Sequence, residues 1–128
     1  MTSSAPRSRL LFWTGLATML PGLQFVFPVA TLGALGIEVG DAAGMFYARH
    51  WGLMAVCVGA LLVVASRPVG ARGAIVLAAM AEKLGLVLLV ALAWNEPALQ
   101  GLRGAAVFDA VCVLLYAPLL WRWAERLG

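Results

Sequence analysis

The sequence predicts an all-α fold, a polytopic membrane protein built as a bundle of four transmembrane helices. Hydrophobic residues make up 63% of the 128 residues and charged residues 12%, against about 25% charged in a typical soluble domain. A soluble domain of this size could not bury so much apolar surface, because small domains keep much of their surface in water. The apolar residues also form four long runs without the alternation of a barrel strand. We therefore expect one transmembrane domain over residues 1–128.

The four expected spans cover residues 10–31, 45–65, 74–94 and 104–121. Each holds roughly 18–22 residues, and about 20 residues cross the hydrocarbon at 1.5 Å per residue. The first run is too long for a signal peptide, which favours an uncleaved helix over a cleaved one. Pro21-Gly22 should bend or loosen it, and Pro28 should end it or bend it again, since proline removes a backbone donor.

The connection that follows the first span, residues 31–44, is rich in glycine. It is expected to be a flexible outer loop with a short surface helix around residues 34–39. Glycines inside the spans have another expected role, because small residues let membrane helices approach closely. These are Gly15, Gly22, Gly52, Gly59 and Gly85.

Basic residues predict the orientation of the chain. Three groups of arginines would share one side of the membrane: Arg7 and Arg9, Arg67 and Arg72, and Arg122 and Arg126. The positive-inside rule places that side, and both termini, in the cytoplasm. We therefore expect a multi-pass protein of a bacterial cytoplasmic (inner) membrane. The positive charges lie at the ends of apolar runs instead of in one patch, which argues against nucleic-acid binding.

Five ionisable residues inside the spans are the chemical signal of the chain. Glu82 and Lys83 lie side by side about 16–18 Å from the outer end of the third span. Ionisable groups at that depth are costly and seldom lack a partner or a task. Adjacent helical side chains point about 100° apart, so each needs its own partner, a water or a neutral state. Arg49 and His50 would lie about 5–7 Å below the outer end, and Asp109 about 8 Å.

Helical spacing predicts which side chains share a face. One face of the second span carries Tyr47, His50, Met54 and Cys57, and one face of the fourth carries Asp109, Cys112 and Tyr116. Glu82 shares its face with small residues, among them Ala78, Ala79 and Gly85. These faces are expected to converge inside the bundle, with Gln24 of the first span in the outer half.

A polar pocket inside the membrane is the resulting expectation. The candidate catalytic residues are His50, Glu82 and Asp109, and the candidate ligand-binding residues are Arg49, Lys83, Gln24 and Tyr47. Structural roles compete with these assignments. Arg49 could anchor the helix at the interface or pair with Asp109, and Glu82 and Lys83 could form interhelical salt bridges that set helix register.

Three functions fit these residues. The first is binding of a small lipophilic ligand or substrate. The second is a membrane isomerase or cyclase, in which His50 with Glu82 or Asp109 would supply one acid and one base across an apolar cavity. The third is a non-catalytic subunit of a membrane complex, and a homo-oligomer is compatible with all three. No metal or cofactor is expected, since metal-ligand spacings and cofactor motifs are lacking.

Short motifs along the chain resemble a known group of proteins. They are Thr14-Gly15-Leu16, Leu20-Pro21-Gly22-Leu23, Arg49-His50-Trp51-Gly52-Leu53, Glu82-Lys83 and Asp109. This pattern is similar to small bacterial four-helix membrane proteins of unassigned function, loosely similar to the DoxX-like group. The resemblance covers nearly the whole chain and implies a four-helix bundle without an agreed activity. DoxX relatives are named for an association with a quinone-linked oxidoreductase, but no quinone or thiosulfate motif supports that role in this sequence.

Overall fold

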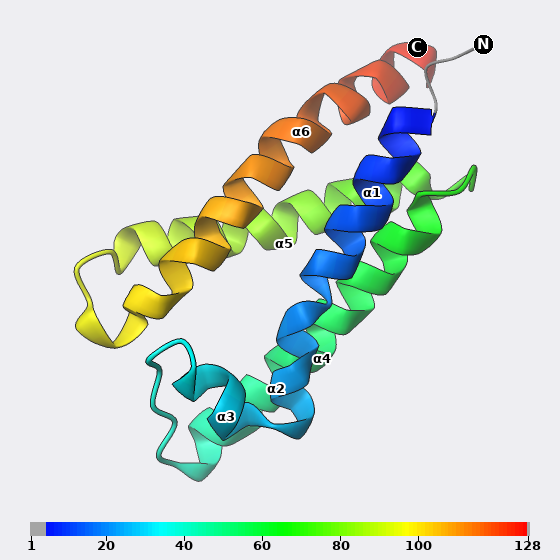
Figure 1. Ribbon diagram of the computed structural model, residues 1–128. Helices are drawn as coiled ribbons and strands as arrows, with labels where there is room; N and C mark the ends of the chain where they lie inside the picture. The colour runs from blue at the N-terminus through cyan, green and yellow to red at the C-terminus, as the bar shows by residue number, and fades with distance from the viewer. Residues whose placement is uncertain (1–4, 128) are drawn as a thin grey trace.

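The computed structural model describes residues 5–127, and helices joined by short turns form this range (Figure 1). No strand occurs within it, which confirms the all-α prediction. Three helical segments are long and apolar enough to cross a membrane. They are α4 (Ala42–Ala65), α5 (Arg72–Leu92) and Pro97–Glu125, the last of which joins the 3₁₀ turn η2 (Pro97–Leu102) to α6 (Arg103–Leu127).

The first apolar run is broken into four short pieces. They are α1 (Ala5–Thr18), the 3₁₀ turn η1 (Leu20–Gly22), α2 (Leu23–Val26) and α3 (Pro28–Gly33). Both predicted breaks are confirmed, at Pro21-Gly22 and at Pro28. Proline lacks the N–H that an α-helix needs in its interior, so each proline stands in the first turn of a new piece. No single helix in this region reaches the length of a span.

The short helix expected around residues 34–39 lies earlier in the chain. The structure has α3 over Pro28–Gly33, followed by a turn and an extended segment. Pro28 favours the start of a helix because its φ angle is already helical. Gly36 has a φ of 71°, a left-handed conformation that glycine adopts without the usual steric cost and that ends the turn. The prediction of a helix at residues 34–39 is therefore wrong.

The three long helices extend beyond or fall short of the expected spans by a few residues. α4 begins at Ala42 because Asp41 caps it, its side chain accepting a hydrogen bond from the N–H of Gly44 at 2.6 Å. α5 ends at Leu92, two residues before the expected end. α6 continues to Leu127 through Pro118.

The helices pack as two pairs, α1 with α4 and α5 with α6 (Figure 1). The start of α1 and the end of α6 lie at the same end of the molecule in Figure 1. α5 runs obliquely to α1 and α4 in that view. The end with the start of α1 and the α4–α5 turn carries arginines, including Arg7, Arg67 and Arg72. We call it the basic end.

Glycines create the close contact between α1 and α4. A Cβ atom added to Gly59 would lie 2.5 Å from the carbonyl oxygen of Gly15, and one added to Gly15 would lie 2.8 Å from that of Gly59. Such distances admit only glycine on both helices. Cβ atoms at Gly22 and Gly52 would also meet the neighbouring helix, so the packing role predicted for these four glycines is confirmed. It is wrong for Gly85, where an added Cβ has nothing within 4 Å.

The apolar core lies in the half of the bundle toward the basic end. Helices α1, α4, α5 and α6 contribute to it, through Leu11, Leu62, Ala65, Val76, Ala79, Cys112, Tyr116 and Leu119. The hydroxyl of Tyr116 donates a hydrogen bond to the hydroxyl of Thr14, which joins α6 to α1. Tyr116 is fully buried. This core places the middle of α5 and the first half of α6 against the other pair of helices.

Candidate functional site

A buried ion pair joins α5 to α6. The Nζ atom of Lys83 lies 2.6 Å from Oδ1 of Asp109, and Lys83 is 1% exposed. Val76, Ala79 and Val90 share the buried face of α5 with Lys83, while Ala106, Cys112 and Tyr116 share that of α6 with Asp109. Packing these two faces together brings the charges into contact. The ring of Phe108 lies beside the ammonium group, its centroid 5.2 Å from Nζ.

Glu82 is the third member of this cluster and has no countercharge of its own. Its side chain is half-buried, and its Oε2 atom is buried without a hydrogen-bond partner in the part of the chain that the structure describes. When all three groups are ionised, Lys83 contributes one positive charge and the two carboxylates contribute two negative charges. One negative charge is therefore left unbalanced inside an apolar bundle, where an unpaired charge is costly.

A small cavity of ≈ 60 Å³ lies against this cluster. Glu82, Lys83 and Asp109 line it on one side, with Phe108 of α6. Residues of the first run and of α4 line the other side, among them Thr18, Pro21, Trp51 and Ala55. A volume above about 10–15 Å³ is enough for a water molecule, so this cavity is large enough for a few waters or a small polar group. It lies at the point where the two helix pairs meet.

Gln24 holds the first run to α4 instead of lining the cavity. It is 1% exposed, and its Nε2 atom donates a hydrogen bond of 2.9 Å to the carbonyl oxygen of Ala48. Pro21 interrupts the helix just before Gln24, which turns this residue toward α4. Its observed contact is thus a link between helices.

Three of the candidate residues lie on the outer surface of α4. Tyr47 is 68% exposed, Arg49 and His50 are also exposed, and the His50 ring stacks on Phe46 with centroids 6.3 Å apart. The predicted convergence of the Tyr47–His50–Met54–Cys57 face inside the bundle is therefore wrong. The small residues of the opposite face, such as Gly52 and Gly59, turn inward because only they permit the close contact with α1.

The structure settles the partner of Asp109 in favour of Lys83. The similar predicted depths of Arg49 and Asp109 made a pair between them the alternative. In the structure Arg49 is exposed on α4, and Asp109 is buried against α5. The predicted face of α6 that carries Asp109, Cys112 and Tyr116 is confirmed, because all three are buried. On the face of Glu82, Ala79 is buried, whereas Ala78 and Gly85 are exposed.

The sequence reasoning missed the apolar and hydroxyl residues that complete the cavity. Thr18 and Phe108 line it, and Trp51 closes it from α4. Thr18 lies four residues after Thr14, which accepts the hydrogen bond from Tyr116, so both threonines share one face of α1. The sequence spacing of these threonines could have indicated a polar inward face on α1. Within residues 5–127, no three histidine, cysteine or acidic side chains come together as metal ligands.

Comparison with known protein families, curated proteins and solved structures finds no match to this chain. The resemblance to the DoxX-like group accordingly stays a prediction. The geometry of the cluster is the basis for a functional assignment.

Proposed function

We propose that this chain is an integral membrane protein whose central cavity binds the polar end of a small lipophilic ligand. One observation carries the proposal. Glu82 lines the cavity, and its Oε2 atom is buried without a hydrogen-bond partner among the described residues. A buried polar atom without a partner costs about 1–3 kcal/mol, and more when it is charged. A water, a proton or a group of a bound ligand would remove that cost.

The chemistry of the cluster limits the kind of ligand. The surplus negative charge beside Lys83 and Asp109 favours a polar end that donates a hydrogen bond or carries a positive charge. The cavity of ≈ 60 Å³ is far below the roughly 300–1,000 Å³ of a site that encloses a whole ligand. The apolar body of the ligand would therefore lie between helices or in lipid. Glu82 exchanges a proton with the bound group. The Lys83–Asp109 pair holds that group in place.

A fourth span and the orientation belong to the same proposal. The pieces α1, η1 and α2 run alongside α4 over residues 5–26. This length is close to the roughly 20 residues that cross a bilayer. Hydrogen bonds from Gln24 to α4 and from Tyr116 to Thr14 attach them to the bundle. The arginines of the basic end support a cytoplasmic position for both termini, because cytoplasmic loops of membrane proteins are rich in Lys and Arg. The membrane would be the bacterial inner membrane.

Glu82→Gln tests the ligand proposal, because glutamine keeps the shape of the side chain but cannot ionise. We expect lipophilic molecules that purify with the unaltered protein to fall at least tenfold in the variant, since hydrogen bonds to charged groups contribute about 1.5–3 kcal/mol. Solvent extracts of the detergent-purified proteins would be compared by mass spectrometry. Glu96→Gln is the matched control, because Glu96 is exposed and lies outside this cavity.

The outcome that contradicts the ligand proposal is an extract from Glu82→Gln identical to that from the unaltered protein. Equal unfolding midpoints of the variant and the control would show that a loss of ligand does not come from a loss of fold.

A second candidate function, a subunit of a membrane complex, is favoured by the outer face of α4. Arg49 and His50 are exposed there beside Phe46 and Tyr47, on a helix apolar enough to cross a membrane. Ionisable side chains within spans almost always face protein or a water-filled cavity instead of lipid. A second copy of this chain would cover them.

Crosslinking through Cys57 tests whether a second copy covers this face of α4. Cys57 lies on the same side of α4 and is exposed, whereas Cys112 is buried. A short bismaleimide added to membranes should give a covalent dimer on a denaturing gel. We expect Cys57→Ser to abolish the dimer and Cys112→Ser to leave it unchanged. A monomer band alone, with Cys57 fully modified, would contradict a second copy on this face.

A further inference from the structure

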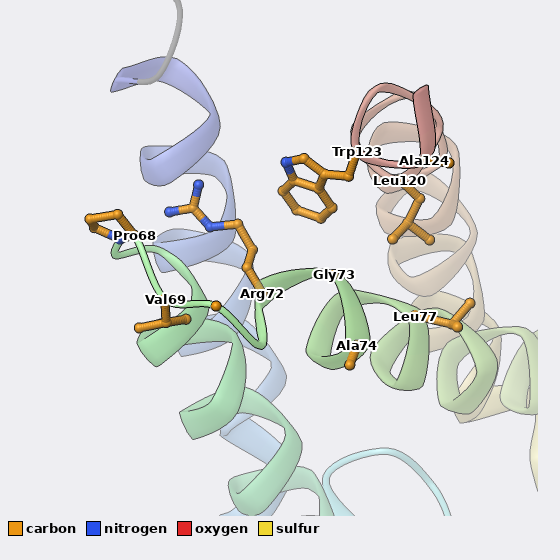
Figure 2. Close-up of a pocket in the computed structure, with 10 residues that line it drawn as sticks. Pro68, Val69, Arg72, Gly73, Ala74, Leu77, Leu120, Trp123 and Ala124 are labelled. Carbon is orange, nitrogen blue, oxygen red and sulfur yellow. The ribbon is translucent and has the colours of Figure 1, made fainter. Parts of the chain in front are cut away.

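A second, larger hollow lies at the basic end of the bundle (Figure 2). Its volume is ≈ 630 Å³, within the roughly 300–1,000 Å³ of ligand sites. The α4–α5 turn, the first turns of α5 and the last turns of α6 form its walls. It shares no lining residue with the cavity at Glu82. We call it the interfacial groove, because it lies where the apolar part of α5 begins.

The groove combines apolar walls with a fixed cation. Val69, Leu77 and Leu120 supply apolar surface, while Arg72 lies between the α4–α5 turn and the indole of Trp123 (Figure 2). The guanidinium carbon of Arg72 is 5.9 Å from the centre of that indole ring. This arrangement suits a molecule that has both an apolar part and an anionic part.

Hydrogen bonds hold the Arg72 side chain in place without using all of its donors. Its Nε atom donates to the carbonyl oxygen of Ala65 at 2.7 Å, and Nη2 donates to those of Ser66 at 3.1 Å and Arg67 at 2.6 Å. These carbonyls belong to the last residue of α4 and the two residues that follow it, and a cation is favourable at a helix C-terminus. Nη1 makes no hydrogen bond to the residues that the structure describes. A guanidinium fixed in this way keeps two N–H donors for a ligand.

Other positive groups lie at the same end. The N–H groups of Gly73 and Ala74 are in the first turn of α5, where they have no intrahelical acceptor. Two further arginines are exposed. Arg67 lies in the α4–α5 turn, and Arg122 lies in the last part of α6, next to Trp123 in the sequence. Among the residues that the structure describes, none that lines the groove is acidic. The charge of this region is therefore complementary to an anion at the membrane surface.

We propose that the interfacial groove binds one anionic phospholipid of the surrounding bilayer. An acyl chain would lie against Leu77 and Leu120, and the phosphate would accept hydrogen bonds from Nη1 of Arg72. Basic pockets between membrane helices bind anionic headgroups in this way, and tryptophan favours the headgroup level. The proposal requires that α5 and α6 span a membrane, but not that the cavity at Glu82 binds a ligand.

Native mass spectrometry of the detergent-purified protein tests this proposal. Dioleoylphosphatidylglycerol and dioleoylphosphatidylcholine would be added separately, and bound lipid counted. We expect one phosphatidylglycerol to bind more tightly than phosphatidylcholine, and Arg72→Gln to weaken it at least tenfold, the effect of losing hydrogen bonds to a charged group. Arg67→Gln is the matched control, because it removes the same charge from the same end outside the groove lining.

A steric variant tests the groove if Arg72→Gln fails to fold. Ala74→Trp would fill the groove, whereas Ala78→Trp would add the same side chain one turn further along α5, outside the lining. We expect only Ala74→Trp to abolish the bound phosphatidylglycerol. Equal binding of the two lipids, equal weakening by Arg72→Gln and Arg67→Gln, or retained binding in Ala74→Trp would each overturn the proposal. If Ala74→Trp loses the bound phosphatidylglycerol but keeps the lipophilic molecules that Glu82→Gln loses, the groove and the cavity at Glu82 are independent sites.

Discussion

Replacing Lys83 by Met is expected to destabilise the folded protein by about 3–5 kcal/mol. The variant would keep the carboxylates of Asp109 and Glu82 inside the bundle and remove the cation that balances one of them. Removing one partner of a buried pair is costly because the remaining charge is left without compensation. Unfolding in mixed micelles, followed by circular dichroism, would measure the change in free energy.

The double variant Lys83→Met with Asp109→Leu provides the control. Apolar residues of similar volume often replace a buried ion pair at little cost, so we expect the double variant to recover most of the stability lost in Lys83→Met. A Lys83→Met protein as stable as the unaltered one would mean that the ion pair does not form in the membrane. A double variant that folds well but loses its bound lipophilic molecules would place the pair in the ligand site.

Gly59→Ala should destabilise the bundle by about 1–3 kcal/mol, the usual cost of overpacking. The new Cβ would lie 2.5 Å from the carbonyl oxygen of Gly15, and backbone atoms of two helices can separate only by moving α1 away from α4. Because α1 lines the cavity through Thr18, the same movement would also enlarge the site. The free energy of unfolding in mixed micelles is again the measurement.

Gly85→Ala is the matched control for Gly59→Ala. A Cβ at Gly85 has nothing within 4 Å, and alanine is favoured over glycine in a helix by about 0.8–1.0 kcal/mol. We expect this variant to be as stable as the unaltered protein or more stable. If both alanine variants behave alike, the close contact between α1 and α4 is absent in the membrane.

Helical spacing identifies the inward face of α6 but not that of α4. It assigned Asp109, Cys112 and Tyr116 to one inward face, because each lies three or four residues from the next on an apolar helix. It failed for the second span, where the face with Tyr47 and His50 is exposed. An apolar membrane helix has weak amphipathic contrast, so polarity does not show which side meets protein. The glycines do, through Gly52 and Gly59, because backbone contact needs the smallest side chain.

Depth along the chain was a poorer guide than contact between helices. Counting residues placed Asp109 in an outer layer and Lys83 in a deeper one, yet their side chains form an ion pair at 2.6 Å. Helical rise gives depth only for helices parallel to the membrane normal, whereas α5 runs obliquely to α1 and α4 in Figure 1. A tilted helix places a given residue at another level. Pairing of charges across helices therefore depends on tilt as well as sequence position.

The sequence by itself determined the helical class, the three long apolar segments, the breaks at Pro21 and Pro28, and the presence of costly charges in the segments that form α5 and α6. These properties follow from composition, proline chemistry and run length, which are local. The adjacency of Glu82 and Lys83 also showed that each needs a separate partner. Only the tertiary structure decided that Lys83 pairs with Asp109 and that an oxygen of Glu82 remains unpaired, because partner choice depends on which helix faces pack together.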